Sequence, residues 1–184
     1  MEIKKAFPGT KVYRDVKELY YSAFASEERL PFTRMTLLNV LKRSVDLLAY
    51  YDGEIFCGFS FTVCTDAYLY INYFAVNPVL RGRGYGTRML KELRARSSSP
   101  ALCDVKVPGE ESAECEQDIR RIAFWKKNGF DFFDNKITIT NSNGVKYFIS
   151  STSSYNRNDY WAIFDHLSFG PKAQLRILKN RIGR

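Results

Sequence analysis

The sequence predicts an α+β protein with a mixed, mostly antiparallel sheet flanked by helices and a basic helical C-terminal extension. Three apolar runs follow one another between residues 46 and 76, separated only by short turns. Helical periodicity lies on both sides of these runs, and lysines and arginines gather in the last residues. The length of 184 residues and the hydrophobic content of 45% suit a globular protein with a sizeable core.

Two helices are predicted before the sheet. Thr10 is a good N-cap, and apolar residues recur at helical spacing after it, which indicates a helix over about 11–25. Ser26–Phe32 breaks this pattern, and a second helix is predicted over about 33–43. Only a brief strand can precede the turn at Pro8–Gly9.

The next elements form an antiparallel meander. Asp52–Gly53 is a strong hairpin signal between the first two of its three predicted strands, which are Asp46–Tyr51, Glu54–Thr65 and Tyr68–Val76. A helix over about 84–97 then leads to a strand over Ala101–Val107. A right-handed crossover would place that strand parallel to Tyr68–Val76.

The last third of the chain is predicted to hold a helix, further strands and the extension. Gly129 is a natural C-cap for a helix over Glu116–Asn128. Strands are predicted to start at Phe130–Phe133 and to flank the hairpin turn Asn141–Gly144, over Ile137–Thr140 and Val145–Ile149. Ser150–Ser154 is predicted to be a polar linker, and a helical pattern follows from Asn158. These elements predict one domain over 1–150 and a helical extension over 151–184.

The stretch Ala75–Leu90 combines a strand end, a turn rich in glycine and arginine, and the start of a helix. The first backbone N–H groups of a helix have no partner within the helix and lie at the positive end of its dipole. Such a site binds phosphate, and glycines let the phosphate approach the backbone. The G-x-G-x-G spacing here is neither the dinucleotide fingerprint nor a P-loop.

Arg81, Gly84 and Gly86 form R-x-x-G-x-G, which resembles the acetyl-CoA pyrophosphate loop of the GCN5-related N-acetyltransferases. A second segment, Arg120–Phe130, reads RRIAFWKKNGF and is similar to the later A-I-x-F-Y-x-x-x-G-F segment of that family. The resemblance covers roughly residues 46–133. It implies an acetyltransferase-like three-layer α/β/α fold over 1–150.

The resemblance implies transfer of an acetyl group from acetyl-CoA to a primary amine of a small molecule or peptide by direct attack. The backbone N–H of Val76 would stabilise the developing oxyanion. The residues implied in cofactor binding are Phe74, Ala75, Val76, Arg81, Gly82, Arg83, Gly84, Tyr85, Gly86, Thr87, Asp118 and Trp125.

Two positions depart from the family pattern. Trp125 stands where many members have a tyrosine that protonates the CoA thiolate, and an indole N–H provides no usable proton. Asp118 stands where an asparagine commonly contacts the cofactor. Glu110 and Glu111, in a loop after the strand at 101–107, are candidate general bases, and the alternative is that they are solvated loop carboxylates.

Composition and cysteine spacing bear on membrane insertion, secretion and metal binding. No apolar run reaches the length of a membrane helix, and the N-terminus lacks the apolar region of a signal peptide. The four cysteines have no zinc spacing, so we expect no metal, reduced thiols and a cytoplasmic location. Apolar residues in the C-terminal segment must cover the domain or form a homodimer contact.

Two alternatives stay open. A catalytically silent acetyl-CoA-binding module would explain Trp125. A nucleic-acid-binding protein would explain the net charge of +8 and the RGRG string. Against the second alternative, RGRG occurs once and no known nucleic-acid motif is present.

Overall fold

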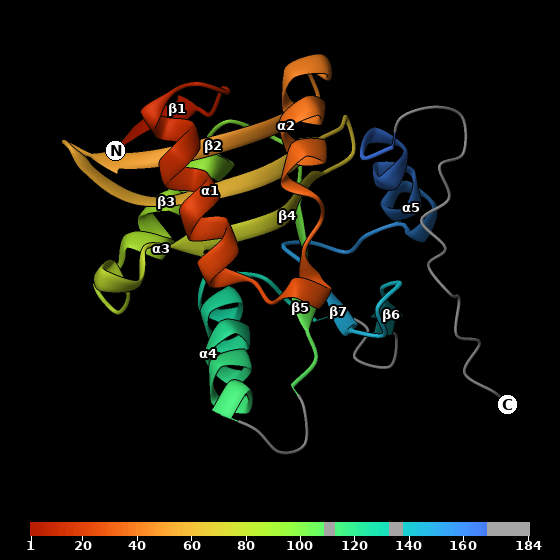
Figure 1. Cartoon of the computed structure of the whole chain (residues 1–184). Helices are drawn as coiled ribbons and strands as arrows, with labels where there is room; N and C mark the ends of the chain where they lie inside the picture. The colour runs from red at the N-terminus through yellow and green to blue at the C-terminus, as the bar shows by residue number, and fades with distance from the viewer. Residues whose placement is uncertain (109–112, 133–137, 169–184) are drawn as a thin grey trace, which may run out of the picture. The chain divides into compact units, whose positions relative to one another are not determined.

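A computed structural model describes residues 1–108, 113–132 and 138–168 of the chain (Figure 1). The chain divides into two compact units, Met1–Ser99 and Pro100–Arg184. Seven strands and five α-helices occur in the described residues. The pairings within each unit are antiparallel, and helices flank the strands, which confirms the predicted α+β class.

The first unit holds four strands in the order β1-β2-β3-β4. Its elements lie close to their predicted limits: β1 (Glu2–Lys5), α1 (Lys11–Ala23), α2 (Phe32–Leu41), β2 (Val45–Asp52), β3 (Ile55–Cys64), β4 (Leu69–Val76) and α3 (Tyr85–Arg94). Two short 3-10 turns, η1 (Ser26–Glu28) and η2 (Pro78–Leu80), complete the unit. The predicted cap of α1 is confirmed, because the Thr10 side chain accepts a hydrogen bond from the Tyr13 N–H.

Helices cover both faces of this four-stranded sheet. On one face, α1 packs against β3 and β4 and α2 packs against β2, and Figure 1 shows α1 crossing the strands. The ring of Phe59 lies 6.1 Å from that of Tyr20 in α1, measured between centroids. Because successive side chains of a strand point to opposite faces, the neighbouring Gly58 faces the other way, toward α3.

Gly58 allows β3, β4 and α3 to pack closely. A Cβ at this position would lie 2.7 Å from Met89 Cε of α3 and would overlap the carbonyl oxygen of Ala75 in β4. The φ angle of +154° is also one that only glycine adopts readily. The helix α3 begins directly after the turn that is rich in glycine and arginine. Its packing therefore depends on the absence of a side chain at Gly58.

The second unit places β7 between β5 and β6, with all pairings antiparallel. Its elements are β5 (Ala101–Lys106), α4 (Ala113–Lys127), β6 (Thr138–Thr140), β7 (Lys146–Ser151) and α5 (Arg157–His166). Gly129 follows α4 with a φ of +83°, as the predicted C-cap requires. The predicted parallel pairing of β5 with β4 would join the two units and stays a prediction.

Two predictions about this unit are wrong. Phe130–Phe132 is not a strand, because only one isolated bridge, from Asp131 to Ser151, forms there; Phe133 lies outside the described residues. Ser150–Ser154 is not wholly a linker, because β7 continues through Ser151, and Ser150 and Ser151 are fully buried. Their hydroxyls donate to backbone carbonyls, which makes a serine run compatible with a buried strand end.

The helix α5 packs within the second unit. Tyr160 is fully buried, and its hydroxyl donates to the Asp104 carboxylate of β5 at 3.0 and 3.1 Å. Ile163 is also fully buried. The basic end of the predicted extension, from residue 169 onward, lies outside the described residues. Among the helices that are described, none is long and apolar enough to cross a membrane.

Candidate functional site

The turn between β4 and α3 is exposed and basic. Arg81, Gly82, Arg83 and Gly84 are all exposed. Gly82 and Gly84 have φ angles of +75° and +80°, in the left-handed region that glycine adopts at no steric cost. The Arg81 side chain reaches back to the end of β4, where its Nε lies 3.4 Å from the carbonyl oxygen of Val76.

The N-terminus of α3 opens onto this turn. Gly84 is its N-cap and has no side chain that could accept from the first N–H groups, and the first turn carries no acidic residue. On its inner side, α3 buries Met89, Leu90 and Leu93. A helix whose first N–H groups are not capped by a side chain can bind an anion, and Arg81 and Arg83 add positive charge beside it.

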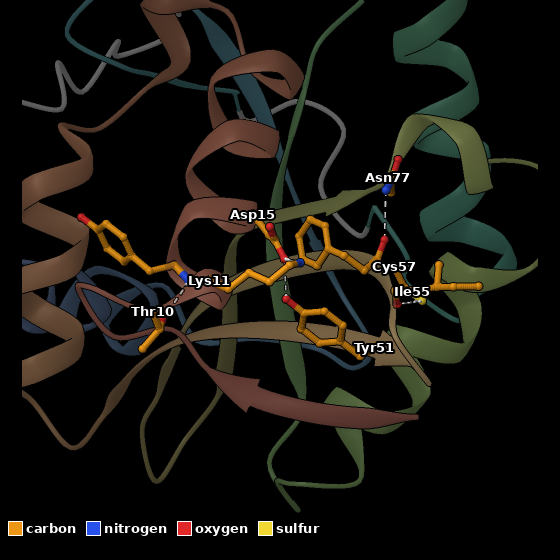
Figure 2. Close-up of polar contacts among 9 residues, drawn as sticks. Thr10, Lys11, Asp15, Tyr51, Ile55, Cys57 and Asn77 are labelled. Carbon is orange, nitrogen blue, oxygen red and sulfur yellow. Dashed lines mark hydrogen bonds and ion pairs between the residues drawn. The ribbon is translucent and has the colours of Figure 1, made fainter.

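The end of β4 is anchored to β3. The Asn77 N–H donates to the Cys57 carbonyl at 2.8 Å, and the Asn77 side-chain amide donates to the Phe56 carbonyl at 3.0 Å. Figure 2 shows the first of these contacts. The Asn77 side-chain oxygen also accepts from the Val79 N–H and so caps η2. These bonds hold the entry to the loop at a constant position relative to the strand.

Asp52, at the end of β2, contacts the first turn of α3. Its carboxylate accepts from the Tyr85 hydroxyl at 3.2 Å and from Arg88 Nη1 at 3.0 Å. The Arg88 guanidinium also lies over the Tyr85 ring, 5.1 Å from its centroid. The Arg88 and Tyr85 hydrogen bonds lower the pKa of Asp52. Asp52 could not be predicted as a site residue from the sequence, because nothing local links it to residues more than thirty positions away.

A second polar cluster lies at the start of α1, against β2. Asp15 accepts from Lys11 Nζ at 2.7 Å and from the Tyr51 hydroxyl at 2.8 Å, as Figure 2 shows. Burial and the neighbouring Asp15 raise the pKa of Tyr51. The phenol therefore stays protonated and donates to Asp15, which ties α1 to the strand that ends at Asp52.

The three predicted strand residues, Phe74, Ala75 and Val76, lie at the C-terminal end of β4. Ala75 is buried opposite Phe59, and Val76 lies opposite Gly58. The structure therefore brings this strand end, the basic turn and the start of α3 together as one continuous segment, as predicted.

A tyrosine clamp, which the sequence analysis did not predict, fixes the connection between α1 and α2. The buried Tyr73 hydroxyl donates to the Glu28 carbonyl and accepts from the Leu30 N–H, both at 2.8 Å. Tyr20 donates to the Leu30 carbonyl at 2.7 Å. Burial raises the pKa of both phenols, so each keeps the proton that it donates.

In the second unit, the predicted site residues Asp118 and Trp125 are buried, with exposed fractions of 2% and 6%. Asp118 Oδ1 accepts from Arg121 Nη1 at 2.8 Å, and its Oδ2 lies 4.0 Å from Lys106 Nζ. The Trp125 ring packs edge-on against Phe130, with centroids 4.8 Å apart. The predicted bases Glu110 and Glu111 lie outside the described residues. No group of three or more potential metal ligands occurs in the parts of the chain that are described.

Comparison with protein-family models identifies the class of protein. Residues 43–131 match the acetyltransferase (GNAT) domain, and this range contains the meander, the basic loop, α3, β5 and α4. Over residues 43–131 the chain belongs to the GNAT family of acetyl-CoA-dependent N-acetyltransferases. No curated protein sequence matches the chain.

Solved structures share the fold at low sequence identity. A GNAT-family protein from Bacteroides thetaiotaomicron has a TM-score of 0.74 and 22% identity, covering 91% of this chain and 96% of its own. Arabidopsis thaliana Naa50, solved with the bisubstrate analogue CoA-Ac-MVNAL, has a TM-score of 0.55 and 19% identity, covering 84% and 100%. A GNAT acetyltransferase from Elizabethkingia anophelis, solved with acetyl-CoA, has a TM-score of 0.52 and 15% identity, covering 83% and 97%.

Proposed function

We propose that the segment Phe74–Thr87 binds acetyl-CoA. Arg81–Thr87 would bind the pyrophosphate, because the left-handed glycines expose the backbone and α3 begins without a side-chain cap. Phe74–Val76 would hydrogen-bond to the pantetheine arm along the end of β4. The exposed turn that leads into the uncapped start of α3 is the observation that carries the proposal.

The proposed reaction is a direct acetyl transfer. A neutral amine nitrogen of the acceptor attacks the thioester carbonyl carbon, so that an N–C bond forms and the C–S bond breaks. The Val76 N–H would donate to the oxygen that gains negative charge. The proton lost by the nitrogen goes to a base, and the CoA thiolate is then protonated. Holding the cofactor and the amine in line contributes much of the rate.

Glu110 or Glu111 is the proposed base. Trp125 cannot protonate the thiolate, so in this proposal the thiolate takes its proton from another group or from water. Asp118 and Trp125 stay proposed cofactor neighbours. Their burial within the second unit supports a role in shaping α4, with Asp118 orienting Arg121.

The acceptor substrate, the cellular location and the domain organisation are also proposals. We propose a primary amine of a small molecule or peptide as the acceptor, and a cytoplasmic location, which the four free thiols support. We also propose one acetyltransferase domain over 1–150, with the segment 151–184 covering it or forming a homodimer contact. The solution mass of the full chain and of a chain ending at residue 155 tests the homodimer.

The test of function measures acetyl-CoA binding and then CoA release. Calorimetry measures acetyl-CoA binding, and a panel of monoamines, polyamines, aminoglycosides and peptide N-termini is then screened for release. CoA should be quantified by chromatography, because the exposed Cys64 thiol would add to the signal of a thiol reagent. Binding with amine-dependent release supports the enzyme. Binding without release supports the silent module, and absence of binding refutes the loop assignment.

A further inference from the structure

The strand β4 carries a bulge at Asn72. Phe61 of β3 lies opposite Tyr73, whereas the next residue of β3, Thr62, lies opposite Ile71. Asn72 is therefore an extra residue with no partner position on β3. Such a bulge breaks the strict alternation of side chains and can turn two consecutive residues to the same face of the sheet.

The contacts of Asn72 identify that face. The Asn72 side-chain amide donates to the Tyr70 hydroxyl at 3.3 Å, and Tyr70 lies opposite Val63. Val63 is two residues from Phe61, so Tyr70 shares the face of Phe61 and Tyr73. That is the face covered by α1. Asn72 and Tyr73 therefore both point to the α1 side of the sheet.

One polar atom on this face is buried without a partner. Asn72 Oδ1 is inaccessible to solvent and forms no hydrogen bond with the described residues. A buried amide oxygen without a hydrogen bond is costly, so native proteins rarely retain one unless another group supplies the donor. An amide oxygen is a neutral acceptor, and the group that matches it is an N–H or O–H.

The surroundings of this oxygen are held rigidly. The adjacent Tyr73 is fixed by its two hydrogen bonds to the α1–α2 connection, at Glu28 and Leu30. Its ring also packs against Tyr20 and Phe24, with centroids 5.1 and 4.9 Å apart. An acceptor on a strand that is held in this way is oriented before a ligand binds, which lowers the entropic cost of binding.

We propose that Asn72 Oδ1 accepts a hydrogen bond from the nitrogen of the acceptor amine and orients it for attack. This inference rests on the proposed function, which places the thioester along Phe74–Val76, two to four residues further along the same strand. A neutral primary amine has two N–H bonds and one lone pair. One N–H can donate to Oδ1 while the lone pair points to the carbonyl carbon. The amide N–H groups of pantetheine share this chemistry, and the experiment separates the two sources.

The test uses two inert CoA derivatives that differ in one group. In both, the CoA sulfur carries CH₂–C(=O)–X–propyl, with X as NH in the amide and as O in the ester. The pantetheine arms are identical, so the ratio of the two Kd values reports only on the nitrogen that represents the acceptor. Kd values are measured by calorimetry for the wild-type chain, Asn72→Leu, Asn72→Asp and the control Thr62→Val. Thr62 flanks the same bulge, but its side chain points to the opposite face.

We expect the wild-type chain to bind the amide about tenfold more tightly than the ester, which is the usual size of one hydrogen bond. Asn72→Leu should bring this ratio to about one without weakening ester binding, and Thr62→Val should leave the ratio unchanged. Asn72→Asp keeps an acceptor oxygen of the same shape and should keep a preference for the amide. If the leucine variant fails to fold, the ratio of Kd values in Asn72→Asp still tests the inference.

Four results would overturn the inference. Equal weakening of both compounds by Asn72→Leu would mean that Oδ1 meets pantetheine or is structural. If Asn72→Leu changed neither the ratio nor the two affinities, Oδ1 would contact neither compound, and loss of the preference in Asn72→Asp would mean that the amide N–H of Asn72 matters instead. A wild-type chain that binds neither compound would refute the proposed function itself, and the inference would fall with it.

Discussion

Replacing Gly84 with alanine tests the proposed cofactor loop directly, because Gly9 provides a matched control. Gly84 and Gly9 have φ angles of +80° and +86°, and at neither position would a Cβ lie within 4 Å of a described atom beyond its chain neighbours. The two substitutions should therefore cost the same backbone strain, about 1–2 kcal/mol of unfolding free energy each. Only Gly84 caps α3 beside the basic turn.

The two variants should differ in binding. A Cβ at Gly84 would stand where the pyrophosphate must approach the backbone N–H groups. The loss of one charge-assisted hydrogen bond, about 1.5–3 kcal/mol, corresponds to a Kd that is roughly 10- to 100-fold higher. Calorimetric titration with acetyl-CoA measures the Kd, and urea unfolding of both variants measures the strain. Gly9→Ala should bind acetyl-CoA like the wild-type chain.

Equal acetyl-CoA affinity in the two variants would refute the assignment of the loop. A loss of affinity in both, in proportion to their loss of stability, would instead mean that binding responds to general destabilisation rather than to the approach of a phosphate.

Three further predictions concern the support of the loop and the thiols. Gly58→Ala should destabilise the chain by more than about 3 kcal/mol in urea unfolding, because its Cβ would overlap a carbonyl oxygen of β4. The lowered pKa of Asp52 stabilises the fold above the ordinary aspartate value of about 3.9, and this contribution is lost as the pH falls below it. Unfolding measured from pH 5 to pH 2 should therefore show a steeper loss of stability in the wild-type chain than in Asp52→Asn. Burial raises the pKa of Cys103 well above its ordinary value, so in the folded protein a disulfide reagent at pH 8 should modify Cys64 and leave Cys103 until the chain unfolds.

Each of these three predictions can be contradicted by a specific result. Unchanged stability in Gly58→Ala would contradict the close packing of β3, β4 and α3. Parallel pH profiles for the wild-type chain and Asp52→Asn would mean that the ion pair with Arg88 contributes nothing to folding. Rapid modification of Cys103 in the folded state would contradict its burial.

The order of the elements could be predicted because the signals that define them are local. Thr10 caps α1 through the Tyr13 N–H three residues away, and Gly53 forms a hairpin between adjacent strands with a φ of +60°. The basic loop is equally local, because Arg81, Gly84 and the start of α3 are consecutive in the sequence. The errors arose where packing overrode composition: Ser150 and Ser151 are polar, and yet they end a buried strand.

The sequence by itself determined the order of helices and strands, the basic, glycine-rich character of the β4–α3 turn and its resemblance to an acetyl-CoA loop. Strand register and contacts distant in sequence were decided only by the tertiary structure. Asn72 became an extra residue because β3 and β4 pair as they do, and Gly58 has no room for a side chain because β4 and α3 pack against it. Asp52 meets Arg88 across 36 positions of the chain. Periodicity describes one segment at a time, whereas such contacts depend on how two segments are aligned, and alignment is set by the packing of the whole sheet.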